Sequence, residues 1–269
     1  LVLDLGLFLL GVCSTSLRFR VLLGLADVAP PISTILRLQM TAYFFNTVIP
    51  GSIGGDVVKA LYVARDAPAS KRTTILLLVF IERLLGVCAL LIMAAIIVLI
   101  RLPVLLADPL LRPLAITVLI LGASVLVGGT LAILIVQKLG DRLDRFTSGP
   151  SKIAKLLNQL VASFLLVSKK PKRLLAALGI SMTFHVLAMG YFTMLTQIIL
   201  ERDVPYASVA TVFALGLLSL MLPISPSGLG VGHVAFKRLF EAIGLAGGAS
   251  IFNVYLLGQI TPSLLGVFP

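Results

Sequence analysis

The chain has 269 residues, of which 59% are hydrophobic and only 12% are charged. Soluble domains usually contain about 45–50% apolar and about 25% charged residues, so this composition excludes a soluble enzyme, a disordered chain and a disulfide scaffold. The formal net charge is +11, from 22 basic and 11 acidic residues. The basic residues lie mostly between apolar runs, which is typical of loops beside membrane-spanning segments and not of a nucleic-acid surface. The composition therefore predicts an all-α polytopic membrane protein with membrane lipids, and no nucleic acid, as partners.

Five apolar segments are long enough to cross a bilayer, which takes about 20 residues. In chain order they are residues 1–17, 73–100, 113–136, 174–200 and 248–268. Two further apolar stretches, residues 33–63 and 206–245, are interrupted by clusters of Pro and Gly.

The distribution of Lys and Arg predicts which loops face the cytoplasm. The loop 138–173 is the richest in basic residues, so we expect it to be cytoplasmic. Arg18 and Arg20 end the first segment, and Arg37 and Lys59 flank the first interrupted stretch, so all four are also expected on the cytoplasmic side. A stretch that begins and ends on one side cannot cross once. Residues 33–63 are therefore predicted to form a re-entrant hairpin.

The second interrupted stretch, 206–245, begins on the outer side by the same reasoning, and it allows two interpretations. It could be a second re-entrant hairpin that breaks near residues 223–232. It could instead cross at 206–222 and continue as a cytoplasmic helix bearing Lys237 and Arg238, which the charge rule favours slightly.

The two breaks resemble each other, since one reads Pro-Gly-Ser-Ile-Gly-Gly from Pro50 and the other Pro-Ser-Gly-Leu-Gly-Val from Pro226. Three crossings separate them, so the second copy would be inverted. The pattern predicts one transmembrane domain, residues 1–269, built as an inverted repeat with two re-entrant hairpins, an organisation known from transporters. Repeat A would cover about 1–137 with hairpin 33–63, and repeat B about 174–269 with hairpin 206–245.

The connector 138–173 contains an amphipathic segment, residues 151–168, with apolar side chains at helical spacing. It could lie on the inner membrane surface or pack on the bundle as a connecting helix. Both interpretations fit the pattern equally well.

The first break is a candidate site. Non-helical backbone at membrane depth must be buried in protein or line a watery cavity. Asn46, Pro50, Gly54 and Gly55 belong to this string, in which glycines allow close approach of a ligand. Asp56 opens the returning helix, where it could cap the helix, attract an ammonium group or pair with an arginine.

Two adjacent charged residues, Glu82 and Arg83, lie about ten residues inside the apolar run 73–100. Charges at this depth are costly and usually face a cavity or a partner. Neighbouring helical residues diverge by about 100°, so we expect Arg83 to pair with Asp56 and Glu82 to face another polar group. The pair could fix the hairpin or bind a headgroup, and the sequence leaves both roles open.

The second break contributes Pro226, Gly228, Gly230 and His233 as further candidates for headgroup binding. His185, which lies alone in the segment 174–200, is interpreted as a hydrogen-bonded packing residue. The sequence has no zinc-spaced His/Cys set, P-loop or nucleophile elbow, so we expect neither a metal nor a cofactor.

Three motifs resemble one known family. Residues 44–59, Phe-Phe-Asn-Thr-Val-Ile-Pro-Gly-Ser-Ile-Gly-Gly-Asp-Val-Val-Lys, are similar to the signature of the lysylphosphatidylglycerol synthase transmembrane-region family of flippase-like membrane proteins. Glu82-Arg83-Leu84-Leu85-Gly86 resembles its Asp-Arg-Leu-x-Gly stretch, and residues 226–231 resemble its Pro-x-Gly-Leu-Gly-Val motif. Two positions depart from the family: Glu82 replaces the usual Asp, and Gly232-His233 stands where a basic residue and Glu are common.

The resemblance implies an inner-membrane protein that moves amphiphiles between leaflets. The family includes translocators of aminoacylated phosphatidylglycerol and proteins linked to hopanoid or other polyisoprenoid lipids. Residues 1–269 contain nothing like the soluble synthase domain, so the resemblance favours flipping over aminoacylation. The Glu that is common in the family at this motif is absent here, where Gly232-His233 stands. A carboxylate would bind a cationic group, so its absence argues against a lysyl lipid as the substrate.

The leading hypothesis is thus a lipid translocator, and not an enzyme, in a bacterial or archaeal cytoplasmic membrane. The two hairpin tips would form a polar cavity near the bilayer middle. One alternative is an intramembrane enzyme with Asp56, Glu82 and His233 as acid and base groups. Another is a non-catalytic partner of an envelope-lipid synthase. A homo-oligomer is compatible with each.

Overall fold

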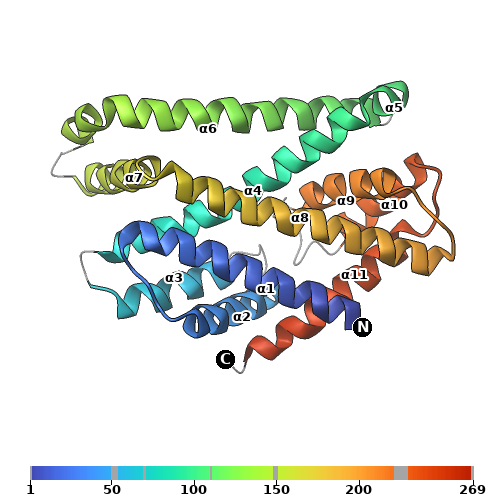
Figure 1. The fold of residues 1–269 in the computed structure, drawn as a ribbon, viewed down its shortest axis with the longest axis horizontal. Helices are drawn as coiled ribbons and strands as arrows, with labels where there is room; N and C mark the ends of the chain where they lie inside the picture. Colours follow the sequence, from blue (N-terminus) through green and yellow to red (C-terminus); the bar gives the residue numbers. More distant parts are fainter. Residues whose placement is uncertain are drawn as a thin grey trace.

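The computed structural model describes residues 2–49, 54–68, 71–109, 111–147, 151–220 and 230–267, whose secondary-structure elements are helices, with no β-strand among them (Figure 1). The helices in chain order are α1 (Val2–Leu23), η1 (Gly24–Ala26), α2 (Ile32–Val48), α3 (Gly54–Asp66), α4 (Arg72–Ile100), α5 (Leu102–Ala107), α6 (Leu111–Thr147), α7 (Lys152–Ser168), α8 (Pro171–Leu200), α9 (Tyr206–Leu220), α10 (Val231–Ala242), α11 (Gly248–Ser263) and η4 (Leu264–Val267).

Five helical segments are long and apolar enough to cross a membrane: Val2–Ala26, Arg72–Ile100, Leu111–Lys138, Pro171–Leu200 and Gly248–Val267. They coincide with the five predicted segments, so the prediction of a multi-pass helical membrane protein is confirmed. The first span is longer than predicted, because the apolar residues after Arg18 continue the helix.

Each interrupted stretch folds as two short antiparallel helices. In the first, the Gly55 amide of α3 donates to Asn46 Oδ1 of α2 at 2.8 Å. In the second, Phe236 of α10 packs against Gly216 of α9 and Gly232 of α10 against Leu220 of α9, so α10 runs back along α9. Residues 50–53 and 221–229 lie outside the described residues, and with them the candidates Pro50, Pro226 and Gly228.

The order of one candidate membrane span, two helices that are not candidate spans and one further span occurs twice, from α1 to α4 and from α8 to α11 with η4. The two leading helices, α1 and α8, pack antiparallel over their length (Figure 1). Near the middle of α1, Ser14 Oγ donates to Ile180 O at 3.4 Å, and near its start Asp4 accepts a hydrogen bond from Tyr191. This arrangement places α1 beside α8 from Arg173, which donates to Gly24 O, to Tyr191.

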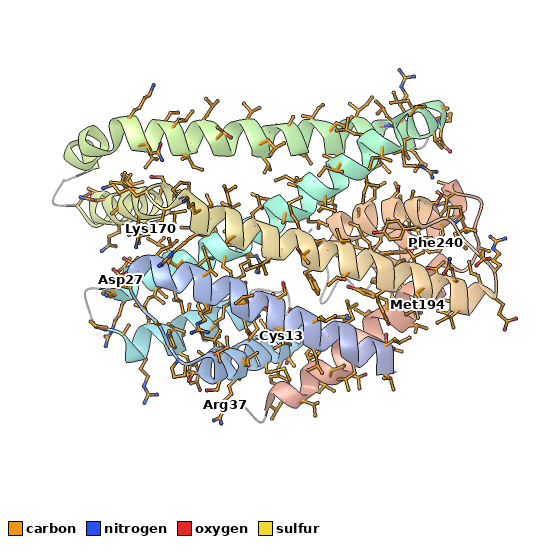
Figure 2. The ribbon with its side chains drawn as sticks, in the orientation of Figure 1. Cys13, Asp27, Arg37, Lys170, Met194 and Phe240 are labelled. Atoms are coloured by element: carbon orange, nitrogen blue, oxygen red, sulfur yellow. The ribbon has the colours of Figure 1, made fainter. Side chains whose placement is uncertain are left out.

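Several helix ends beside the loops that were predicted to be cytoplasmic gather at one end of the molecule, here called the basic end. There Lys71 Nζ donates to Asp27 O at 3.3 Å, and Lys170 Nζ lies 3.8 Å from Asp27 Oδ1. Figure 2 shows Asp27 and Lys170 at the same end of the molecule. The side chain of Gln137, near the end of the α6 span, donates to Ser168 O at 2.8 Å.

Two of the basic residues used for orientation do not lie at this end, and that prediction is wrong. Arg18 is largely buried within α1, five residues before the helix ends at Leu23, and Lys59 is only 2% exposed within α3. Both face polar partners inside the bundle, which offset the cost of burying their charges.

The amphipathic segment of the connector is α7, which begins with the Ser151 side chain accepting from Ala154 N at 3.0 Å. It packs against α6, α4 and α8 (Figure 1), with Ser163 and Val167 buried and Leu157 exposed. The structure therefore supports the connecting-helix interpretation. The preceding helix α6 runs farther than predicted, to Thr147.

Apolar side chains form two separate cores. One joins the end of α1 and the start of α4 to η1, α2 and α3. The other joins the second half of α4 to α8, α9, α10 and α11, and is rich in aromatic rings; Phe192 stacks on Phe213 with ring centroids 4.6 Å apart. Since α4 belongs to both cores, its middle segment, which carries Glu82 and Arg83, lies between them.

Candidate functional site

A polar cavity of about 320 Å³ lies between the two cores. Its described walls come from α1, α2, α3, α4 and α8. The polar side chains that line it are Ser14, Thr15, Arg18, Gln39, Tyr43, Asn46, Asp56, Lys59, Glu82, Arg83, Ser181 and His185. Such a concentration of polar groups in a chain of this composition marks the cavity as the best candidate site.

Glu82 is the centre of a buried ion network. Its Oε2 lies 2.5 Å from Lys59 Nζ and its Oε1 lies 3.1 Å from Arg18 Nη2. Lys59 also reaches Gln39 Oε1 at 3.4 Å and sits 4.6 Å from the centre of the Phe19 ring. Two cations thus share one carboxylate, which confirms the prediction that Glu82 faces a polar group other than Arg83.

The second ion pair joins the first hairpin to α4. Arg83 Nη1 lies 2.8 Å from Asp56 Oδ2, as the sequence predicted. Asp56 Oδ1 is 3.9 Å from Lys59 Nζ, one helical turn along α3. Because Asp56 is in the first turn of α3, its carboxylate also lies in the favourable field of the helix N-terminus.

The candidates of the first break hold its two helices close together. Asn46 uses its side-chain oxygen to accept from the Gly55 amide, so it satisfies an otherwise unpaired donor at the start of α3. A Cβ on Gly55 would overlap the Ala42 carbonyl oxygen of α2, and one on Gly54 would overlap the Ile49 side chain. These glycines therefore set the close approach that brings Asp56 to the cavity.

Arg18 enters the cavity from α1. It donates from Nη1 to Ser181 Oγ of α8 at 2.9 Å and from Nη2 to Glu82. Gly86, four residues after Glu82, leaves room for the guanidinium, since a Cβ there would lie 3.3 Å from Arg18 Nη1. A larger residue at the last position of the Glu-Arg-Leu-Leu-Gly motif would thus crowd the Arg18 guanidinium.

His185 also lines the cavity from α8. Its Nδ1 and the Nε of Arg18 are buried and have no hydrogen-bond partner among the described residues. The sequence interprets His185 as a hydrogen-bonded packing residue. The structure pairs it with the Gly86 backbone of α4 and also places it on the cavity wall.

The described candidates of the second break lie elsewhere. Gly230 has a φ of 87°, a conformation that favours glycine, and is the N-cap residue that precedes α10. His233 is half-buried and hydrogen-bonds to Asn253 of α11, and its ring packs edge-on against Phe252. Neither Gly230 nor His233 is among the described residues that line the polar cavity. Their role in headgroup binding stays a prediction.

An apolar groove of about 440 Å³ runs between α3 and α4 and is open to the outside of the protein. Its walls include the exposed side chains of Val57, Leu61 and Phe80. Asp56 and Arg83 line both this groove and the polar cavity. The ion pair between them is therefore the boundary between a polar and an apolar compartment.

Sequence reasoning found Asn46, Asp56, Glu82 and Arg83 but missed the partners contributed by α1 and α8. The signal for Arg18 was present, because apolar residues continue for several positions beyond it. Lys59 lies one helical turn after Asp56 and so shares its face. For His185 and Ser181 there was no such local signal, because the packing of α8 on α1 brings them to the cavity.

A family model described as the lysylphosphatidylglycerol synthase TM region matches residues 1–266. No curated protein and no solved structure matches the chain.

Proposed function

Because the chain belongs to the lysylphosphatidylglycerol synthase TM region family, we propose that it is a translocator that moves an amphiphilic lipid between the leaflets of a bacterial or archaeal cytoplasmic membrane. The headgroup would occupy the polar cavity and the chains would remain in the apolar groove between α3 and α4. The observation that carries this proposal is the Asp56–Arg83 pair, which borders both compartments.

The depth of the cavity supports this proposal. Glu82 is ten residues from the start of α4 at Arg72, which is about 15 Å along a helix axis and half of a hydrocarbon core about 30 Å thick. A headgroup bound there would be close to the bilayer middle. Buried charges at that depth are costly and usually mark a substrate path.

The two short helix pairs would serve as re-entrant hairpins. With 13 residues α3 is too short to span a bilayer, and α2 with 17 is at the lower limit, but each is long enough to reach the bilayer middle. The antiparallel packing of α1 on α8 and the repeated element order support an inverted repeat. Rocking of one repeat against the other would then expose the cavity to each leaflet in turn.

In this scheme the second hairpin approaches the headgroup path from the opposite side, with its break at Pro226, Gly228 and Gly230 and with His233 just beyond. The enzyme alternative has less support, because the carboxylates of Asp56 and Glu82 are both engaged by cations and His233 contacts Asn253. An envelope-lipid synthase would be a partner that supplies the lipid.

The test is transport of fluorescent lipids in proteoliposomes that contain the purified protein. We expect transport by the unchanged protein and its loss in Asp56→Ala and in Arg83→Ala, because each change removes the ion pair that borders both the cavity and the groove. Arg238→Ala is a matched control, since Arg238 forms an exposed pair with Glu241 on α10. Full transport by both cavity variants would refute this site, and conversion of the lipid to a new product would favour the enzyme.

A further inference from the structure

The polar cavity has an excess of positive charge. The described residues bring three cations to its wall, Arg18, Lys59 and Arg83, and two carboxylates, Asp56 and Glu82. Asp56 is paired with Arg83, and Glu82 is shared between Arg18 and Lys59. Asp56 also lies 3.9 Å from Lys59 Nζ, so the five charges form one network, in which one positive charge remains uncompensated.

The hairpin breaks supply no further carboxylate. Residues 50–53 are Pro, Gly, Ser and Ile, and residues 221–229 are Met, Leu, Pro, Ile, Ser, Pro, Ser, Gly and Leu, so neither segment carries a charge. His185 can only add positive charge. The excess is thus a property of the sequence and of the packing of α1, α3 and α4 together.

An uncompensated charge in a low-dielectric interior is strongly unfavourable unless a counter-ion or hydrogen bonds satisfy it. Lys59 is 2% exposed, and the cavity holds a donor, Arg18 Nε, with no hydrogen-bond partner among the described residues. Both facts favour a ligand that brings a single negative charge and acceptor oxygens. A cationic headgroup would instead add a second uncompensated charge.

We propose that the translocated lipid has a phosphodiester headgroup with one net negative charge, held by Arg18 and Lys59 beside Glu82. This inference rests on the proposed function, because it names the substrate class of the same cavity. The chains of such a lipid would extend past the Asp56–Arg83 pair into the groove between α3 and α4. The zwitterionic and cationic lipids of the same membrane would be poor substrates.

The decisive variant is Gln39→Glu. Gln39 is buried and its Oε1 lies 3.4 Å from Lys59 Nζ, so a carboxylate there would supply the missing negative charge with almost no change in shape. We expect the midpoint of thermal unfolding to rise, because the new carboxylate compensates the excess charge. Binding of the anionic lipid should fall by about tenfold or more, because the lipid loses one charge-assisted interaction with Lys59. A merely structural cluster would not lose lipid binding as it gained stability.

Two further variants guard against misfolding as an explanation. Gln39→Glu cancels the excess positive charge by adding a carboxylate. Lys59→Met cancels it by removing a cation, and it should also weaken anionic-lipid binding. Lys237→Met is the matched control, since it makes the same change at an exposed position on α10 and should leave binding unchanged.

The experiment measures two quantities for the full chain: binding in detergent, by native mass spectrometry, and transport in proteoliposomes. The probes are phosphatidylglycerol, phosphatidylcholine, lysyl-phosphatidylglycerol and the soluble headgroup glycerophosphoglycerol. We expect phosphatidylglycerol to bind and cross at least about tenfold better than the zwitterionic and cationic lipids. Equal binding of the soluble headgroup would show that the ligand is a free phosphodiester and would overturn the lipid part of the inference.

The outcomes separate this inference from the proposed function. Transport without preference for the anionic lipid, or a preference that survives Gln39→Glu, would overturn the inference and leave translocation standing. Selective binding of phosphatidylglycerol without any transport would support the anion site and overturn the proposed function.

Discussion

The two short helix pairs have similar breaks in the sequence but very different surroundings. The pair α2–α3 borders a network of five charged side chains contributed by α1, α3 and α4. The pair α9–α10 packs into an aromatic core, where Phe236 stacks on Phe252 with ring centroids 4.7 Å apart. A repeated motif therefore specifies a helix break, whereas the helices packed around it decide its chemistry.

In the proposed translocator, this difference would give the two helix pairs separate tasks. Aromatic packing holds α9 and α10 firmly against α8 and α11, because large rings bury much apolar area and interlock. The charges around α3 are held by ion pairs that can exchange one partner for another of like charge. The first pair is thus suited to bind a charged group, and the second to act as a rigid counterpart.

The largest expected effect is in the network of charged residues beside α2 and α3. Glu82→Ala would leave Arg18 and Lys59 buried without their shared carboxylate, and we expect it to lower the free energy of unfolding by about 3–5 kcal/mol. The measurement is the midpoint of thermal unfolding in detergent, together with lipid transport. A variant as stable as the unchanged protein would contradict the central place of Glu82 in the network.

In the aromatic half, Phe236→Ala should cost about 3 kcal/mol, the lower end of the range for buried Phe, because neighbouring rings can relax into the space. Phe80→Ala is the matched control, since Phe80 is exposed on α4. Comparison of unfolding midpoints would show the difference. If both changes were equally mild, the packed role of α9–α10 would be wrong.

A smaller effect is expected at the close approach of α2 and α3. Gly55→Ala places a methyl group against the Ala42 carbonyl and should lower stability by about 1–3 kcal/mol, as overpacking does. Gly128→Ala on α6 is the contrasting change, because nothing lies within 4 Å of its Cβ position. That variant should be neutral or slightly stabilised, by about 1 kcal/mol at most.

The smallest effect is expected at His233. His233→Ala removes a hydrogen bond to Asn253 and should cost about 1 kcal/mol of stability. Because His233 is not among the described residues that line the polar cavity, transport should fall less than in Arg83→Ala. A loss of transport as complete as in Arg83→Ala would show that the second hairpin binds the headgroup directly.

Much of the fold was predictable from local pattern. All five spans, both helix breaks and the partner of Arg83 follow from apolar run length, Pro and Gly clusters and the cost of isolated charges. The basic flanks at Lys71 and Lys170 also meet at one end as expected. The errors concern Arg18 and Lys59, where a charge near the end of an apolar run was taken to be a loop signal.

The sequence by itself determined that this chain is a multi-pass helical membrane protein with two interrupted hydrophobic stretches, because bilayer thickness and backbone hydrogen bonding leave few other solutions for such a composition. Only the tertiary structure decided which charges meet. Arg18, Lys59 and Glu82 are far apart in the chain and come together because α1, α3 and α4 pack side by side, and a buried charge takes whatever partner that packing brings within reach.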